Sequence, residues 1–191
     1  MTKRLIVGIT GASGVIYGIR ALELLRHTEI ETHLILSPAA KATIAQETDW
    51  KVSDVEALAA AKYDHRDVGA AIASGSFATM GMMIAPCSIK TLSAVANSFS
   101  ADLLSRAADV CLKEGRPLLL MVRETPFHLG HLRLMAQAAE AGAIIFPPAP
   151  AFYDRPKSID DIVNATVGRA LARLGIENNA YTKWKGMSEN E

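Results

Sequence analysis

"LIVGITGASGVIYGIR", residues 5–20, carries the chain from β-branched apolar residues into a turn with glycines at positions 8, 11 and 14. A segment with helical period follows directly. A buried strand that turns on glycines into a helix is typical of parallel α/β sheets. The turn presents backbone amides, together with Thr10 and Ser13, at the positive end of the following helix, where a phosphate can bind.

The glycine spacing in this turn is G-x-x-G-x-x-G, whereas dinucleotide-binding folds use G-x-G-x-x-G. Those folds also carry an acid near the end of the second strand, which binds the ribose hydroxyls. Ser37 stands at that place here. The stretch therefore favours a mononucleotide over a dinucleotide, and a tight turn with a structural role alone is the alternative.

Apolar runs alternate with segments of helical period along the rest of the chain. Further strands are expected at residues 32–37, 80–86, 117–122 and 143–148, because these runs are almost continuously apolar. Helices are expected within residues 15–26, 37–48, 88–114, 128–142 and 158–175. The alternation predicts the α/β class with a Rossmann-like, doubly wound parallel sheet in three αβα layers. Residues 62–79 have the least pattern and are expected to form a loop near a site.

The composition is that of an ordinary globular protein. The chain has 191 residues, 50% of them hydrophobic, and its 20 basic and 20 acidic side chains cancel. This balance indicates neither a nucleic-acid nor a membrane partner, and no run reaches the roughly 18 apolar residues of a membrane span. Only two cysteines occur, which favours a reducing, cytoplasmic compartment. We expect one domain over residues 1–177 and a polar C-terminal tail over residues 178–191.

Polar residues also follow the third expected strand. Ser88, Lys90 and Thr91 open the next helix, and ligands of open α/β sheets bind beyond the carboxyl ends of the strands. Two polar strand ends at one crevice are better evidence for a site than either alone. Cys87 could act as a nucleophile, but no histidine is placed in the sequence to activate it, and small buried cysteines are common.

The fourth and fifth strands end in a similar way. Arg123 and Glu124 follow the fourth strand, and Tyr153 follows the fifth. Arg169 lies in a helical segment otherwise rich in Ala, Val and Leu, where a guanidinium needs an anion or an acidic partner. These residues are candidates for binding an anionic ligand.

Two motifs imitate metal sites. "DDIVN", residues 160–164, resembles an aspartate-rich magnesium motif, yet it lies in a first helical turn, where acids favour the helix dipole. "HLGH", residues 128–131, has the spacing of two ligands but lacks a third. We expect no metal.

Five segments together closely resemble the UbiX-type flavin prenyltransferases, which include small subunits encoded with hydroxyarylic acid decarboxylases. In chain order they are "GITGASGVIYGIR", "AQETD", "SGSFATMGMMIAPCSIKTLS", "LLSRAADVCLKEGRPLLLMVRETPFHLGHLRLM" and "PPAPAFYDRPKSIDDIV". The likeness covers residues 4–176. It implies a cytoplasmic, flavodoxin-like homododecamer that binds FMN in the domain over residues 1–177.

The activity implied by the resemblance is a metal-independent transfer. The dimethylallyl group of dimethylallyl phosphate goes to N5 and C6 of reduced FMN, and the product is prenylated FMN. A UbiD-type decarboxylase receives it, in ubiquinone biosynthesis or in aromatic acid decarboxylation.

The resemblance also implies which residues form the site. The catalytic set is Ser13, Glu47, Lys113, Arg123 and Glu124. The flavin-binding set is Gly11, Ala12, Ser13, Ser37, Ser88, Ile89, Lys90, Thr91, Arg106 and Arg123. The set that binds dimethylallyl phosphate is Lys113, Arg123, Tyr153 and Arg169. Because these residues are scattered, we expect contacts between subunits to complete the pocket.

Two other functions stay open from the sequence. FMN-dependent cysteine decarboxylases share this architecture, but they use a histidine on an early helix, and residues 15–26 and 38–48 contain none. A flavin carrier or non-catalytic decarboxylase subunit is the other, and it would leave the set of phosphate-binding residues unexplained.

Overall fold

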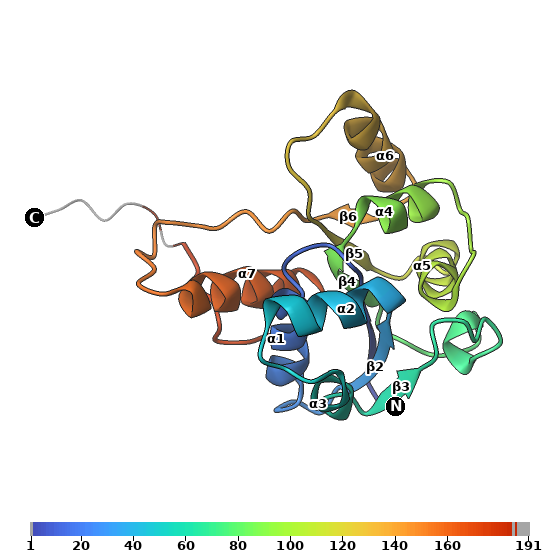
Figure 1. Cartoon of the computed structure of the whole chain (residues 1–191), viewed down its shortest axis with the longest axis horizontal. Coiled ribbons are helices and arrows are strands. Elements are labelled where there is room, and N and C mark those ends of the chain that lie inside the picture. The colour runs from blue at the N-terminus through green and yellow to red at the C-terminus, as the bar shows by residue number, and fades with distance from the viewer. Residues whose placement is uncertain (1, 185, 187–191) are drawn as a thin grey trace, which may run out of the picture.

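The computed structural model describes residues 2–184 and 186, and it contains one six-stranded parallel sheet (Figure 1). The strand order is β3-β2-β1-β4-β5-β6. The strands are β1 (Arg4–Ile9), β2 (Glu31–Leu36), β3 (Ala61–Tyr63), β4 (Met82–Cys87), β5 (Leu118–Val122) and β6 (Ile144–Ile145). The helices are α1 (Ile16–Leu25), α2 (Pro38–Glu47), α3 (Val52–Ala57), η1 (Ala71–Ala73), α4 (Ile89–Ala96), α5 (Leu103–Lys113), α6 (Leu129–Glu140) and α7 (Ile159–Arg173).

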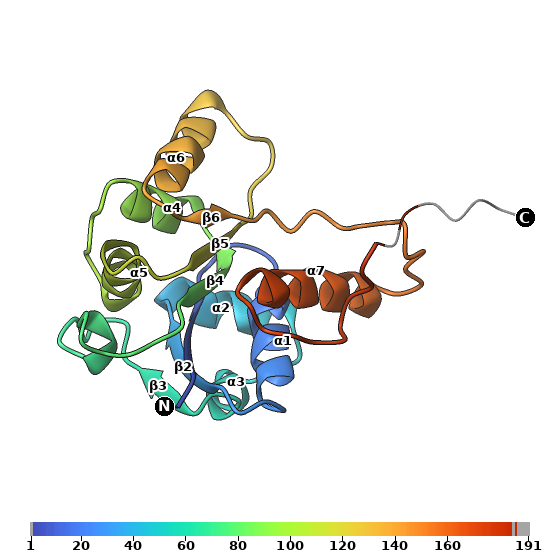
Figure 2. The same ribbon diagram turned by 180° about the vertical axis from the view of Figure 1, so that it is seen from behind.

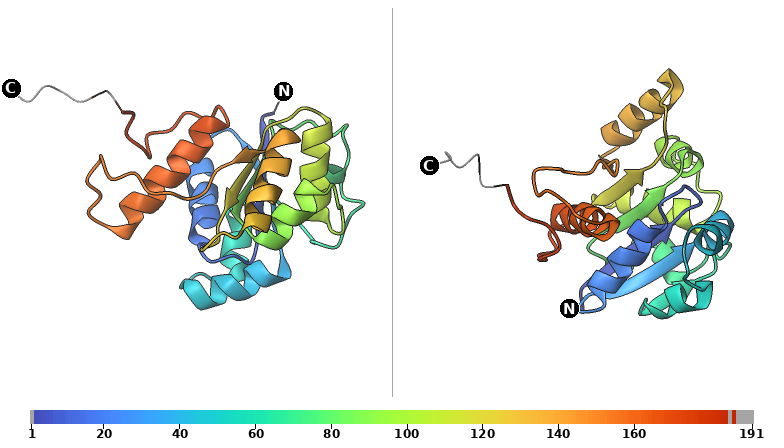
Figure 3. Two further views of the ribbon diagram at one scale, coloured as in Figure 1. Left: turned by 90° about the horizontal axis from the view of Figure 1, so that it is seen from above. Right: turned by 60° about the vertical axis from the view of Figure 1, so that its left-hand side comes forward.

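Helices cover both faces of the sheet, as the alternation of runs predicted (Figure 3, left). Successive strand residues point to opposite faces, so Leu5 and Val7 pack against α1, α2, α3 and α7, whereas Ile6 packs against α4, α5, α6 and η1. Seen from behind, α7 packs against α1 and crosses it (Figure 2). Each face therefore has its own apolar core, and the α/β three-layer prediction is confirmed.

The winding of the sheet reverses between β1 and β4. β1 pairs with β2 on one side and with β4 on the other, both in parallel. The chain leaves β1 toward β2 and returns later to β4. The loops that follow β1 and β4 are therefore far apart in the sequence but close together in the structure. Ligands of open α/β sheets bind at this switch point.

Capping residues begin and end several helices where the sequence indicates. Ser37 Oγ accepts the Ala40 N–H at 3.1 Å, with Pro38 at the first helical position of α2. Ser158 and Asp161 form a reciprocal capping box at the start of α7. Gly142 follows α6 with a φ of 104°, a left-handed conformation that favours glycine.

The prediction of a loop over residues 62–79 is partly wrong, because β3 overlaps the start of this range and η1 lies within it. β3 pairs with β2 over three residues, which is too short to show a period in the sequence. The strand expected over residues 143–148 keeps only two residues, since Pro147 and Pro148 have no N–H for a strand ladder. No helix of the described residues is both long and apolar enough to span a bilayer.

His33 is a nearly buried histidine on β2. Its Nδ1 lies 2.9 Å from the Tyr63 hydroxyl, its ring meets the edge of Phe77, and its Nε2 has no hydrogen-bond partner within the described residues. Burial lowers the pKa of His33, while the charges of Glu31 and Arg4 raise and lower it by less. The fold therefore favours the neutral ring.

We predict that this histidine makes stability depend on pH. The unfolded chain binds the proton more tightly, with a pKa of about 6.5, so the free energy of unfolding falls as the pH drops from about 7.5 to 5.5. Urea unfolding of the wild type and of His33→Gln measures it, and the variant should lose less stability over this range. His27→Gln, at an exposed histidine, is the control and should behave as the wild type. Equal losses in all three proteins would contradict the prediction.

Candidate functional site

A buried threonine joins the two loops at the switch point. The Thr10 hydroxyl donates to the Pro86 carbonyl at 2.7 Å and accepts the Ser88 N–H at 2.8 Å. Thr10 is almost fully buried, so water has little access to replace these two hydrogen bonds. The ends of β1 and β4 are thereby held side by side, and the helices that follow them start at one crevice.

The glycine turn after β1 packs closely on α2. A Cβ on Gly11 would lie 2.3 Å from the Ala39 Cβ, so only glycine fits there. Gly14 has a φ of 94°, and no side chain caps the first turn of α1. The Gly14 N–H instead donates to Glu47 Oε2 at 2.8 Å. A carboxylate thus already binds an amide of this turn, which is where an anion is expected. Ala12 and Ser13 are half-buried in the same turn.

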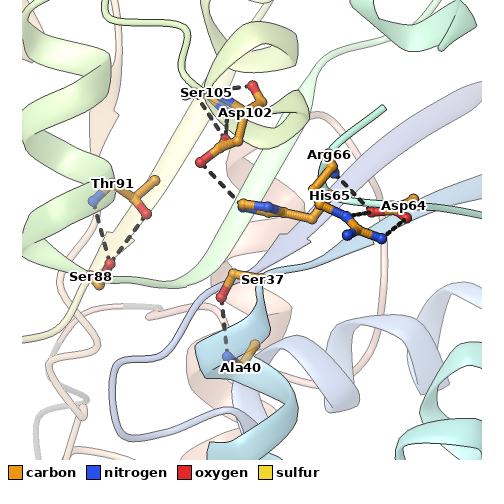
Figure 4. Close-up of polar contacts among 9 residues, drawn as sticks. All are labelled: Ser37, Ala40, Asp64, His65, Arg66, Ser88, Thr91, Asp102 and Ser105. Atoms are coloured by element: carbon orange, nitrogen blue, oxygen red, sulfur yellow. Dashed lines mark hydrogen bonds and ion pairs between the residues drawn. The ribbon is translucent and has the colours of Figure 1, made fainter. Parts of the chain in front are cut away.

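A cavity of about 420 Å³ opens beside the turn, between the first turns of α2, α4 and α5 (Figure 4). Ser88 Oγ accepts the Thr91 N–H at 3.3 Å and caps α4, as Ser37 caps α2. The positive ends of these two helices and the Lys90 ammonium favour a bound anion. The lining residues are Thr10, Gly11, Ser37, Pro38, Ala39, His65, Ser88, Lys90, Thr91, Ala94, Asp102 and Ser105. The cavity thus brings together five predicted flavin-binding residues, and Ile89 lies half-buried between Ser88 and Lys90.

Three polar lining residues, His65, Asp102 and Ser105, are absent from the sequence-based prediction of the site. His65 Nε2 lies 3.2 Å from Asp102 Oδ2, and Asp102 Oδ1 accepts both the N–H and the hydroxyl of Ser105, at 2.8 and 2.9 Å. The Asp-x-x-Ser spacing is visible in the sequence as a helix cap, although nothing there indicates a site. His65 gives no signal at all, because it follows a strand of three residues.

Arg123 and Glu124 directly follow β5, at the same end of the strands as the cavity. The Arg123 N–H donates to the Cys87 carbonyl at 3.1 Å, which places the end of β5 next to the end of β4. Burial raises the pKa of Tyr17 on α1, and the nearby positive charge of Arg123 acts in the opposite direction. Glu124 accepts the Thr125 N–H at 2.9 Å and is exposed.

Lys113 and Arg106 lie outside the cavity. Lys113 ends α5 and pairs with Glu114, just before β5 begins. A helix that leads into a parallel strand ends near the point where that strand starts. The cavity lies where the strands end, so Lys113 is at the opposite end of the strands from the cavity. Within one chain the structure does not bring Lys113 to the other predicted residues. Arg106 binds Asp109 at 3.0 Å within α5.

Tyr153 and Arg169 also lie away from the cavity. Tyr153 is on the arm that runs outward from β6 before the chain returns as α7 (Figure 1). Its hydroxyl donates to the Thr182 carbonyl at 3.3 Å, and its ring meets that of Trp184 edge to face, 5.2 Å between centroids. The start of the predicted tail therefore contacts this arm. Arg169 is exposed on α7.

The nucleophile and metal motifs have structural roles. Cys87 is fully buried, and burial raises the pKa of its thiol, which disfavours the reactive thiolate. Asp161 belongs to the cap of α7, and His128 Nδ1 accepts the Gly130 N–H at the start of α6. The described residues contain no group of three or more His, Cys, Asp or Glu side chains placed to share a metal ion.

We predict that Thr10→Val destabilises the protein by about 2 kcal/mol, because the variant loses both hydroxyl bonds: the Ser88 N–H is left without its acceptor, and the Pro86 carbonyl keeps only the backbone N–H of residue 10, at 3.3 Å. Denaturant unfolding measures the change. The control is Thr43→Val, since the Thr43 hydroxyl donates only to Ala39 O on the exposed side of α2. Losses of equal size in the two variants would show that Thr10 has no special role.

The chain matches known proteins over nearly its whole length. The pattern of the Flavoprotein family covers residues 1–171. The flavin prenyltransferase UbiX of Thauera aromatica is 58% identical over 188 residues, which are 98% of this chain and 97% of the relative.

Two solved structures are similar in fold and sequence. The crystal structure of AnUbiX (PadA1) in complex with FMN and dimethylallyl pyrophosphate has a TM-score of 0.96 at 45% identity, and covers 98% of this chain and 100% of that one. The dodecameric FMN-dependent UbiX-like decarboxylase of Escherichia coli O157:H7 has a TM-score of 0.93 at 44% identity, and covers 96% and 100%. The chain therefore belongs to the Flavoprotein family, and within it to the UbiX flavin prenyltransferases.

Proposed function

We propose that this chain transfers the dimethylallyl group of dimethylallyl phosphate to N5 and C6 of reduced FMN. The prenylated FMN passes to a UbiD-type decarboxylase in the cytoplasm. The observation that carries this proposal is the cavity at the switch point, where two capped helix starts and a lysine favour an anion, in a chain that matches UbiX proteins from end to end.

The residues of the cavity suit FMN. The cavity of about 420 Å³ lies within the range of roughly 300–1,000 Å³ that small ligands occupy. The hydroxyls of Ser37, Ser88 and Thr91, with the amides of the helix starts, match a phosphate and a polyol chain. Pro38 and Ala94 supply apolar contact for a ring system. Gly11, Ala12, Ser13, Ile89, Lys90, Arg106 and Arg123 complete the proposed flavin-binding set.

Reduced FMN supplies the two nucleophilic atoms, N5 and C6, that receive the five-carbon unit. The protein must stabilise the charge that grows on the departing phosphate. Arg123 at the end of β5 and Arg169 on α7 are cations that can bind phosphate oxygens, the first in a position to act at the crevice. The Tyr153 hydroxyl and Lys113 add donors to the same phosphate.

Ser13, Glu47 and Glu124 have further roles in the proposal. Ser13 binds the prenyl phosphate where it meets the flavin. Glu124 accepts the proton that leaves C6, as its exposed carboxylate at the sheet edge allows. Glu47 orients the flavin from its place against the Gly14 amide.

Assembly completes the site in this proposal. α6 carries the exposed apolar side chains of Leu129 and Leu132, with Phe127 before it, and Ala138 is its single buried residue among those the structure describes. Such a helix face suits contact with another copy. Lys113 lies far from the cavity of its own chain, so it serves the site of a neighbour. We propose a homo-oligomer, a dodecamer as in the E. coli O157:H7 relative.

Mass spectrometry of the flavin tests the activity. The protein is mixed with reduced FMN and dimethylallyl monophosphate, and the product should gain one C5H8 unit. Ser13→Ala and Glu47→Ala should each lower the rate by about a hundredfold, the lower limit for a lost catalytic group.

Ser53→Ala and Glu29→Ala are matched controls on the surface and should keep the full rate. An unchanged flavin with the wild-type protein would favour a flavin carrier. Decarboxylation of a cysteine peptide without gain of C5H8 would favour the cysteine decarboxylases.

Mixed oligomers test the role of Lys113. Lys113→Ala and Ser13→Ala chains, each with a strongly reduced rate alone, are produced together in one cell. Sites that combine Ser13 of one chain with Lys113 of another then regain the complete set, and activity should return. If Lys113 acts within its own chain, the mixture stays as inactive as either variant.

A further inference from the structure

His65 and Asp102 contact each other in the wall of the cavity, and neither belongs to the proposed flavin-binding set. His65 Nε2 lies 3.2 Å from Asp102 Oδ2, and both side chains are largely buried. The His65 carbonyl also accepts the Leu103 N–H at 2.9 Å, so the loop after β3 is fixed to the start of α5. Figure 4 shows the imidazole between this helix and Ser37. The ring therefore has a defined place in the cavity wall.

Asp102 presents a difficulty for an anion-binding cavity. Its carboxylate caps α5 through Ser105, so it stays at the cavity whatever ligand enters. An uncompensated carboxylate there would repel the phosphate that the starts of α2 and α4 attract. A protonated His65 removes this repulsion, because the imidazolium and the carboxylate form a neutral pair.

We infer that protonated His65 binds the phosphate of FMN, with Asp102 as the residue that positions its ring. Asp102 accepts the proton on Nε2, and the other ring nitrogen, Nδ1, makes no hydrogen bond to any described residue. Nδ1–H is thus available to the ligand as a charged donor. The inference rests on the proposed function, since it takes FMN as the ligand.

Binding of the phosphate is then coupled to a proton on His65. The charged groups around the ring are Asp102 from α5, Lys90 from α4, Lys41 from α2, Glu56 from α3, Lys62 from β3, and Asp64 and Arg66 from its own loop. Glu56 binds both lysines from α2 and β3, and Asp64 binds Arg66, so these groups largely compensate one another. FMN affinity should therefore fall when the pH is raised far enough to remove this proton.

The test measures dissociation constants by calorimetry for oxidised FMN and for riboflavin, which lacks the phosphate. At about pH 6, His65→Gln should bind FMN about tenfold more weakly than the wild type, the effect of one charged hydrogen bond. The difference should shrink as the pH is raised, because the variant has no proton to lose at position 65. Riboflavin should bind both proteins equally. The phosphate titrates in both proteins, so their ratio isolates His65.

A second variant separates binding from structure. Asp102→Asn keeps a helix cap, since asparagine caps as well as aspartate. Added to His65→Gln, it should recover part of the FMN affinity, because the repelling carboxylate is gone. His27→Gln is the control and should match the wild type throughout. Thermal unfolding confirms that each variant is folded, and if His65→Gln is not, His65→Asn replaces it in every comparison.

The inference is overturned if His65→Gln binds FMN as the wild type does at about pH 6, if riboflavin loses affinity equally, or if the second substitution recovers nothing. If His65→Gln does not fold, an FMN affinity of His65→Asn equal to that of the wild type overturns it. A wild-type protein that binds no FMN overturns the proposed function itself, a result distinct from each of these.

Discussion

The Thr10 hydroxyl bonds to both strand ends at the point where the winding of the sheet reverses. Its two hydrogen bonds set the distance between the glycine turn after β1 and the start of α4 after β4. The cavity lies between these segments, so its width depends on this side chain. A single buried polar group with both bonding capacities satisfied thus connects the core of the sheet to the site.

The glycine turn adds a second constraint on the same region. Gly11 lets α2 approach the turn, and Glu47 at the far end of α2 binds the Gly14 amide. One helix therefore contacts the turn along its length, with its capped start at the cavity and its last residue at the amide. The orientation of α2 therefore fixes both Ser37 and Glu47 relative to the turn, although the two residues stand at opposite ends of the helix.

Much of the fold could be predicted from the sequence because its signals are local. Glycine spacing, continuous apolar runs and caps such as Ser37 and Ser158 depend on neighbouring residues alone, and they were confirmed. β3 was missed because three residues carry no period, and α3 because its six residues make less than two helical turns.

The site was less predictable, because it is made by residues far apart in the chain. The sequence indicated Ser37, Ser88 and Thr91, which line the cavity, since each follows a strand end and the parallel topology gathers those ends. His65 and Asp102 meet through a long-range contact that no local pattern records. Lys113 ends α5 at the opposite end of the strands from the cavity. Its role in the site therefore stays a prediction, and it requires a second chain.

The two edges of the sheet have a bearing on self-association. β3 has three residues and β6 has two, so neither edge offers a long row of unpaired amides and carbonyls. Strands of other chains cannot extend such a sheet with many hydrogen bonds, which protects a protein with an apolar outer helix from edge-to-edge aggregation. Contacts between copies are therefore directed to helical surfaces, where shape and side-chain identity decide the partner.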